Sequence, residues 1–152
     1  MRLWRLTTAG SEALDGSGPL RHGSRYSSPG KPVIHFASEA ALSVLVMLRY
    51  LPEDRSEWLD DTVLGWTDVD AVPEPVPDAG DDSLVTRWVD EWLDSRRSLL
   101  AAIPSRVLPE ADIVMMNPLH DAFERVAPLT CRPFDFAECL HRPPMLDTYR
   151  SG

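Results

Sequence analysis

Apolar and polar residues follow one another along the first part of the chain in a way that predicts a strand, a long loop and a turn. Residues 2–7, RLWRLT, alternate and are typical of a β-strand. Residues 8–31 are rich in Gly, Ser and Thr with little periodicity, which predicts a long loop, and loops of this length are usually functional or mobile. At its end SPGK (28–31) predicts a type II turn, because Pro29 fixes φ and Gly30 accepts a positive φ.

A predicted strand and a predicted helix follow this turn. Residues 32–37, PVIHFA, alternate His35 with apolar neighbours, as a half-buried strand does. Residues from about 39 to 51 are apolar nearly all round, which predicts a helix that is buried on most sides. Ser38 is the predicted N-cap, and Glu39 in the first turn complements the helix dipole.

The middle of the chain holds its clearest helical pattern. In residues 83–97 apolar residues recur every four positions, acidic residues precede the segment and arginines close it, as the helix dipole favours. Residues 58–66 are more strand-like than helical. Residues 72–82 combine three prolines with several acids, which predicts an exposed irregular connector inside the domain rather than a boundary.

Short elements complete the chain. Residues 99–103 and 112–116 predict buried strands that each end in a turn. AFERV (122–126) predicts one helical turn, and RPFDF (132–136) predicts a last strand. Short strands mixed with two main helices predict one compact α+β domain over residues 1–152, a length that suits a single domain with its own core.

Composition and charge narrow the choice of function. The chain is 43% hydrophobic and has a net charge of −9, which argues against a nucleic-acid surface, because such a surface needs clustered Lys and Arg. Its two cysteines, Cys131 and Cys139, do not imply a disulfide framework. The N-terminus has no apolar core of a signal peptide, and no window approaches the roughly 20 apolar residues of a membrane span. We therefore expect a soluble, cytoplasmic protein.

General catalytic motifs are absent from the sequence. It contains neither GxGxxG nor GxxxxGK[ST], so neither usual phosphate-binding loop is present. HExxH, paired CxxC, EF-hand and GxSxG patterns are also absent. Because the four histidines lie far apart in the sequence, we expect no metal site.

Four segments together resemble the RES-domain family, which is named for an arginine, a glutamate and a serine. They are, in chain order, LWRL, GSRYSSPGKPVIHFAS, SLLAAIPSRVLPEADIVMMNPLHDAF and RPFDF. The resemblance covers nearly the whole chain and is weakest across residues 72–82. It rests on the order and spacing of segments that are each weak alone.

The resemblance implies a fold similar to that of bacterial ADP-ribosyltransferase toxins, with a central cleft and NAD as substrate. Family members are toxins of bacterial toxin–antitoxin pairs and break the bond between nicotinamide and ribose. The ADP-ribosyl group then goes to water, to phosphate or, in some members, to a protein side chain. The implied partner is an antitoxin with a helix-turn-helix part of the Xre type and a segment that blocks the cleft, so we expect a hetero-oligomer.

The resemblance also implies which residues contact NAD. Arg25 falls on the family arginine, whose guanidinium would grip the pyrophosphate through two parallel hydrogen bonds. Arg5 falls where the family often has a second arginine for the dinucleotide; its alternative role is an edge-strand charge. His35 takes the place of a tyrosine that stacks on the nicotinamide. Tyr26 takes the place of a tryptophan and would offer aromatic surface to NAD or simply pack.

The family serine corresponds to Ser105. Its hydroxyl would hydrogen-bond the ribose or the nicotinamide amide, or it would only satisfy the turn after a strand. Arg25, His35 and Ser105 are therefore the candidate catalytic residues. Asn117, which follows in the same segment, is expected to cap its loop, and His120 is expected to be a hydrogen-bonded loop histidine.

The family glutamate is missing from this chain. Its position is occupied by Val46, and Glu39 lies two turns away, roughly 10 Å along the helix axis, too far to substitute. A carboxylate there would bind a ribose hydroxyl and stabilise an oxocarbenium-like transition state, a demand shared with glycoside hydrolysis.

Several functions stay open. The first is a toxin that cleaves NAD, and the departures at Val46 and His35 favour a protein acceptor over free hydrolysis. The second is a binding module without catalytic activity that engages its antitoxin or another protein. The third is an unrelated α+β domain whose motif matches arise by chance.

Overall fold

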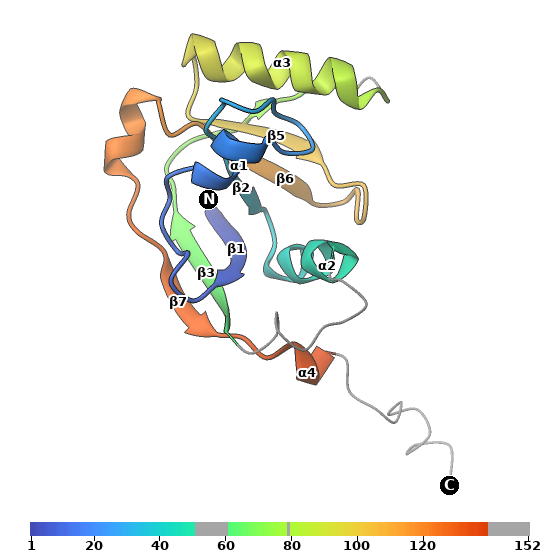
Figure 1. The fold of residues 1–152 in the computed structure, drawn as a ribbon, viewed down its shortest axis with the longest axis vertical. Helices are drawn as coiled ribbons and strands as arrows, with labels where there is room; N and C mark the ends of the chain where they lie inside the picture. The colour runs from blue at the N-terminus through green and yellow to red at the C-terminus, as the bar shows by residue number, and fades with distance from the viewer. Residues whose placement is uncertain (51–60, 79, 140–152) are drawn as a thin grey trace, which may run out of the picture.

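The protein is built on one seven-stranded mixed sheet, seen in a computed structural model that describes residues 1–50, 61–78 and 80–139 (Figure 1). The strands are β1 (Arg2–Thr8), β2 (Ile34–Ala37), β3 (Thr62–Asp68), β4 (Glu74–Pro75), β5 (Leu100–Pro104), β6 (Asp112–Met116) and β7 (Thr130–Pro133). The helices are α1 (Ser17–His22), α2 (Ala40–Tyr50), α3 (Asp82–Ser95) and α4 (Phe136–Cys139), with a 3-10 helix η1 (Asp121–Arg125). The strand order is β4-β5-β6-β2-β1-β3-β7, and only the β4–β5 pair is parallel.

The predicted α+β class is confirmed, because the sheet combines mainly antiparallel strands with separate helices. The strands predicted at 2–7, 32–37, 99–103 and 112–116 are β1, β2, β5 and β6. The strongest helical pattern, at 83–97, is α3. Its Asp81 side chain caps the helix by accepting the Ser83 backbone N–H at 2.8 Å.

Four sequence predictions are wrong in detail. The loop predicted over 8–31 contains α1, whose six residues are too few to show periodicity. The connector predicted over 72–82 carries β4, which pairs with β5, and Val76 beside it is buried. The last strand ends at Pro133, and Phe136 begins α4 instead. The strand predicted over 58–66 runs through Thr62–Asp68, and residues 51–60 lie outside the described part.

Helix α2 is less buried than its apolar sequence predicts. Leu42 is fully buried, but Leu45 is 38% exposed and Val46 is half-buried. The predicted N-cap is also wrong, since α2 begins at Ala40. The Ser38 hydroxyl instead accepts the backbone N–H of Asp112 at 2.9 Å, which ties the start of α2 to β6.

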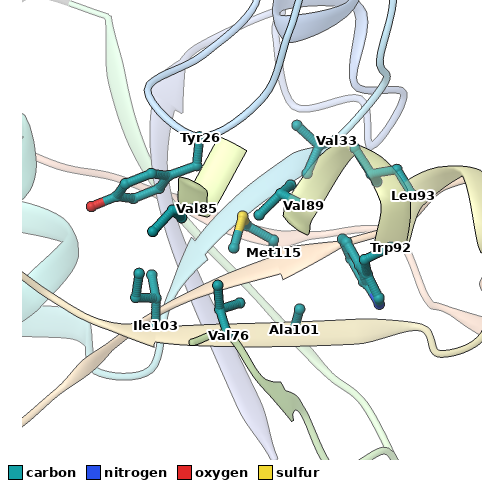
Figure 2. Close-up of a cluster of buried hydrophobic side chains, with 10 residues drawn as sticks. All are labelled: Tyr26, Val33, Val76, Val85, Val89, Trp92, Leu93, Ala101, Ile103 and Met115. Carbon is teal, nitrogen blue, oxygen red and sulfur yellow. The ribbon is translucent and has the colours of Figure 1, made fainter. Parts of the chain in front are cut away.

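One core lies between α3 and the β4-β5-β6 part of the sheet (Figures 1 and 2). Its buried residues are Tyr26, Val33, Val76, Val85, Val89, Trp92, Leu93, Ala101, Ile103 and Met115. A second core contains Leu100, Val114 and Met116 from the same strands. Because neighbouring residues of a strand point to opposite faces, Ala101 and Met115 serve the first core while these neighbours serve the second.

The sheet is almost divided between β1 and β2. β1 pairs with β3 along its whole length, from Arg2↔Asp68 to Thr8↔Thr62. It pairs with β2 only at Trp4↔Ala37. Two blocks of strands, β4-β5-β6-β2 and β1-β3-β7, therefore share one sheet but part from each other along most of this junction.

Candidate functional site

A cavity of about 830 Å³ lies where the two blocks part. Its walls come from β1, the segment 10–26, β2, α2 and the turn between β5 and β6. It brings together every site residue that the sequence predicts, namely Arg5, Arg25, Tyr26, His35 and Ser105, together with Val46. These residues span 101 positions of the chain, from 5 to 105, so only the fold assembles them.

The cavity is cationic although the chain is acidic. Of the residues that the structure describes, five arginines line it, namely Arg5, Arg21, Arg25, Arg49 and Arg106, together with one carboxylate, Asp15. The whole chain carries a net charge of −9. Positive charge concentrated in a concave, partly apolar site raises the local concentration of anionic ligands.

Arg5 is a half-buried cation in the middle of the sheet. β1 lies between β2 and β3, so the alternative reading of Arg5 as an edge-strand charge is wrong. Burial lowers the pKa of its guanidinium, and the charge of Asp15 partly offsets this. Among the described residues it makes no hydrogen bond or ion pair. A desolvated cation that makes no hydrogen bond is costly, so an anion in the cavity would be stabilising.

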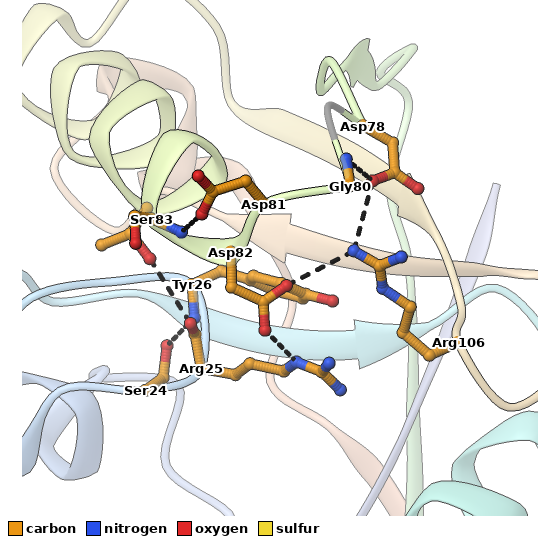
Figure 3. Close-up of polar contacts among 10 residues, drawn as sticks. Ser24, Arg25, Tyr26, Asp78, Gly80, Asp81, Asp82, Ser83 and Arg106 are labelled. Carbon is orange, nitrogen blue, oxygen red and sulfur yellow. Dashed lines mark hydrogen bonds and ion pairs between the residues drawn. The ribbon is translucent and has the colours of Figure 1, made fainter.

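Arg25 and Arg106, which both line the cavity, are held by one carboxylate from the first turn of α3 (Figure 3). Arg25 Nε donates to Asp82 Oδ2 at 3.0 Å, and Arg106 Nη2 donates to Asp82 Oδ1 at 3.3 Å. The Tyr26 hydroxyl and then Asp78 raise the pKa of Arg106. The Arg25 guanidinium also lies over the Tyr26 ring, 5.4 Å from its centroid. These contacts fix two cations that come from different parts of the chain.

A polar stripe on α3 anchors the segment that carries Arg25. The stripe consists of Asp82, Thr86, Asp90 and Asp94, which recur every four residues along one face of the helix. Ser28 donates its backbone N–H and its hydroxyl to Asp90 at 3.0 and 2.6 Å, and Lys31 Nζ donates to Asp94 Oδ2 at 2.6 Å. The predicted turn is confirmed by the 3.3 Å Lys31 N–H to Ser28 carbonyl bond and by φ of 88° at Gly30.

His35 is an uncharged group in this cationic surrounding. Burial, and then the positive charge of Arg5, lower its pKa from 6.5 to about 4. Its Nε2 lies 3.4 Å from Ser24 Oγ, which is 2.7 Å from Ser27 Oγ. At neutral pH the cavity therefore presents a neutral imidazole, which stacks on a planar ring without adding charge.

The lowered pKa of His35 should make stability depend on pH. Because the folded pKa lies below the unfolded value, the unfolded chain binds more protons between about pH 6.5 and about pH 4. The contribution of neutral His35 is complete above this window and is lost as the pH falls through it. From about pH 7.5 to about pH 5 the parent should lose about 2 kcal/mol more than His35→Gln, as measured by urea unfolding. Equal losses in both proteins would contradict this assignment.

Tyr26 and Ser105 each have a structural role beside the cavity. Tyr26 is 5% exposed and packs in the first core (Figure 2). Ser105 is 3% exposed, and its hydroxyl oxygen accepts the Val107 backbone N–H at 3.2 Å, which closes the turn after β5. The Ser105 hydroxyl proton makes no hydrogen bond to another described residue. Tyr26 therefore packs in the core and Ser105 stabilises its turn, which are the structural roles that the sequence left open, and both residues also line the cavity.

Val46 places an apolar wall where the family pattern has a carboxylate. Its side chain packs beside Ala37, Leu42 and Ala111 and faces the cavity. Glu39 is exposed and does not line the cavity. The expectation that Glu39 cannot take the place of the missing glutamate agrees with this position.

Asn117 and His120 stabilise the loop after β6, as the sequence predicts. Asn117 is fully buried; its Nδ2 donates to the Leu93 carbonyl at 3.0 Å and its Oδ1 accepts the Leu119 N–H at 3.0 Å. His120 Nδ1 accepts the Ala122 N–H at 3.0 Å and so caps η1. Neither residue lines the cavity.

Sequence reasoning did not find four of the polar residues at the site. Arg106 directly follows Ser105, so its neighbour could have indicated its place. Asp15 and Arg21 lie in a stretch without periodicity, and no local pattern marks them. Asp82 belongs to a predicted helix N-terminus, but its partners are 57 and 24 residues away in sequence.

Two further features of the described residues bear on ligands. Within residues 1–50, 61–78 and 80–139, no group of three or more His, Cys, Asp and Glu side chains is placed to hold a metal ion. Over the same ranges, every helix is too short or too polar to cross a lipid bilayer.

Comparison with known proteins gives consistent matches. A model of the RES domain family matches residues 2–137. Toxin Res of Pseudomonas putida is 33% identical over 140 residues, which cover 79% of this chain and 86% of the relative. Toxin Res of Photorhabdus laumondii is 29% identical over 140 residues, covering 82% and 86%. A Prs ADP-ribosylating toxin of Sphingobium is 28% identical over 136 residues, covering 77% and 82%.

The fold is also found in a solved structure. The chain is similar to one in the crystal structure of the M. tuberculosis MbcT–MbcA toxin–antitoxin complex, with a TM-score of 0.72. The match covers 90% of this chain and 85% of that chain at 16% sequence identity. At this identity the likeness establishes the fold alone.

Proposed function

Because this chain belongs to the RES-domain family, we propose that it is the toxin of a bacterial toxin–antitoxin pair that binds NAD and cleaves its nicotinamide–ribose bond. The reaction transfers ADP-ribose to water, to phosphate or to a protein side chain. The name of the Sphingobium relative, an ADP-ribosylating toxin, supports this class of reaction. The protein would act in the bacterial cytoplasm, where it meets NAD.

The observation that carries the proposal is the arginine-lined cavity. NAD is a long, anionic molecule with a pyrophosphate at its centre and two flat rings at its ends. A volume of about 830 Å³ lies within the usual range of ligand pockets, which is about 300–1,000 Å³. Among the described lining residues, five arginines against one carboxylate complement the negative charge of the pyrophosphate, and a guanidinium binds phosphate oxygens through paired hydrogen bonds.

Four of the predicted residues then have a role in binding, and Tyr26 packs beside them. Arg5, which makes no hydrogen bond to another described residue, and Arg25 bind the pyrophosphate. Neutral His35 stacks on the nicotinamide, where a charged imidazolium would repel the positive ring. The Ser105 hydroxyl accepts the Val107 N–H and uses its own proton to donate to the ribose or to the nicotinamide amide.

Nicotinamide release is the direct test. The purified chain should release nicotinamide from NAD, and Arg25→Ala should lower kcat/KM by about 10- to 100-fold, because a hydrogen bond to a charged group is worth about 1.5–3 kcal/mol. Chromatography of the products distinguishes the acceptors, since hydrolysis gives ADP-ribose and protein modification gives a mass increase on a target.

The Val46→Glu variant separates the proposal from its alternative. Turnover in the parent shows that another group serves in place of the missing glutamate. Turnover in Val46→Glu alone would mean that the parent keeps the fold without the chemistry. If neither protein releases nicotinamide, the proposed reaction is contradicted.

A second candidate function, a binding module without turnover, is favoured by the apolar wall at Val46. In that case the cavity would bind its antitoxin or another protein. The structural neighbour is a toxin–antitoxin complex, which supports an antitoxin partner for either function. Such an antitoxin, with its helix-turn-helix part of the Xre type, would block the cavity. Partner binding without nicotinamide release would favour this second function.

A further inference from the structure

Among the described residues that line the cavity, Asp15 is the one acidic side chain. It stands in the stretch between β1 and α1, and the other charged side chains of these described lining residues are arginines. Asp15 and Arg5 interact electrostatically, so the carboxylate lies near the guanidinium on β1. A carboxylate in this site weakens the attraction of the arginines for anionic ligands. A role of the carboxylate in the reaction would compensate for this loss of affinity.

The neighbouring acid, Glu12, points elsewhere. Its charge acts on Cys131 of β7, at the edge of the sheet, and it does not line the cavity. Asp15 interacts instead with Arg5, on the cavity side of the same segment. Two acids three residues apart are therefore directed to different parts of the molecule, and only the second reaches the cavity.

A close backbone contact holds Asp15 in place. Gly16 is buried with φ of 65°, and a Cβ on it would lie only 2.8 Å from the backbone nitrogen of Val33, which directly precedes β2. The residue after Asp15 is thereby fixed against the segment that leads into the strand that carries His35. Asp15 Oδ1 accepts the Ser17 N–H at 2.9 Å. Because a carboxylate has about four acceptor sites and this side chain is exposed, acceptor capacity remains for a ligand.

We propose that Asp15 is the catalytic carboxylate of this cavity and that it contacts the nicotinamide ribose in place of a group at position 46. The inference rests on the proposed function and extends it to a residue of a different segment. Val46 leaves α2 without a carboxylate, and Asp15 supplies one from the stretch between β1 and α1.

The proposed step balances without a further reactant. The bond between ribose C1′ and the nicotinamide nitrogen breaks, and its electron pair leaves with neutral nicotinamide. The ribose becomes oxocarbenium-like, and the Asp15 carboxylate accepts a hydrogen bond from a ribose hydroxyl while its charge stabilises the positive ring. Water, phosphate or a protein nucleophile bonds to C1′, and for water one proton is released to solvent.

The test compares Asp15→Asn with Glu12→Gln. The Asn side chain still accepts the Ser17 N–H, so this variant removes the charge and keeps the turn. Glu12→Gln removes the same charge from the same segment outside the cavity. Asp15→Asn should lower kcat for nicotinamide release about 10²- to 10³-fold, whereas Glu12→Gln should stay within about twofold of the parent.

Binding of ADP-ribose, measured by calorimetry, distinguishes catalysis from folding of the segment. ADP-ribose carries the same pyrophosphate, so Asp15→Asn should bind it as well as the parent or more tightly, because a like charge is gone. A loss of affinity as large as the loss of kcat would show that Asp15 only positions the segment and would overturn the inference. So would equal kcat values in Asp15→Asn and Glu12→Gln.

A double variant tests directly whether a glutamate at position 46 can replace Asp15. Val46→Glu introduced into Asp15→Asn should recover at least about tenfold of the lost kcat, because one carboxylate in the cavity can then replace the other. No recovery would overturn the proposed exchange of roles. If the parent itself releases no nicotinamide, the proposed function and this inference fail together, whereas an active parent with an unaffected Asp15→Asn variant removes the inference alone.

Discussion

Replacing Arg5 with methionine and Arg25 with alanine in one chain should weaken NAD binding about a thousandfold, from the roughly 1.5–3 kcal/mol that each charge-assisted hydrogen bond contributes. The two arginines come from different elements that line the cavity, Arg5 from β1 and Arg25 from the segment 10–26, where it bonds to Asp82 of α3. Their contributions should add to a good approximation, since each belongs to a separate element. Calorimetry with ADP-ribose measures the effect without turnover.

The matched control is Arg2→Met. Arg2 lies three residues before Arg5 on the same strand, but it pairs with Asp68 at 2.8 Å on the surface and does not line the cavity. Its replacement removes the same charge and should change ADP-ribose affinity by less than about twofold, because exposed ion pairs contribute little. Equal losses in the control and the double variant would show a general charge effect and contradict the assigned site.

Stability should respond to Arg5 in the opposite direction. Arg5→Met alone removes a half-buried cation that has no hydrogen bond among the described residues and keeps most of the side-chain volume. Such replacements are often neutral or stabilising. Urea unfolding without ligand should therefore find Arg5→Met at least as stable as the parent while its ligand affinity falls, a combination that a folding defect does not produce.

Trp92→Ala should cost about 3–5 kcal/mol of unfolding free energy, the largest stability effect that we expect from one substitution. Trp92 belongs to α3 and is fully buried in the first core (Figure 2). Its Nε1 donates to Ser98 Oγ at 2.8 Å, and Ser98 in turn donates to Glu74 Oε2 of β4 at 2.8 Å. The substitution leaves a large void and also breaks the link between α3 and the sheet edge.

Trp88→Ala is the comparison for this prediction. Trp88 stacks on Trp92 with ring centroids 6.4 Å apart, but it is only half-buried and Arg97 lies over its outer face at 4.8 Å. Its loss should cost about half as much, because the area removed from water is smaller. Similar urea midpoints for both variants would mean that α3 is held mainly by its polar stripe and not by the first core.

Local patterns predicted most of the elements because local rules govern them. The alternation of β1, the turn at Gly30 and the caps at Asp81 and Asn117 depend on residues close in sequence. Elements that depend on distant partners were mistaken. β4 looks like an irregular proline-rich stretch until β5 is placed beside it.

The residues of the candidate site also fall into two groups, those that the sequence predicted and those that depend on distant contacts. Residues inside quoted family segments, such as Arg25, His35 and Ser105, were predicted, and the fold brings them to one cavity. The surplus of arginines in that cavity could not be predicted, because Arg21 and Arg49 are ordinary exposed cations in their own helices. The position of Asp15 depends on the contact between Gly16 and Val33, which no sequence pattern records.

The junction between β1 and β2 has a consequence for how the molecule holds together. Strands that meet at only Trp4↔Ala37 leave the two blocks of the sheet joined by little backbone hydrogen bonding. A ligand bound to Arg5 on one block and to His35 on the other spans this junction and acts as a cross-link. Under the proposed function, substrate or antitoxin in the cavity would therefore also stabilise the folded protein, because it would join the two blocks of the sheet.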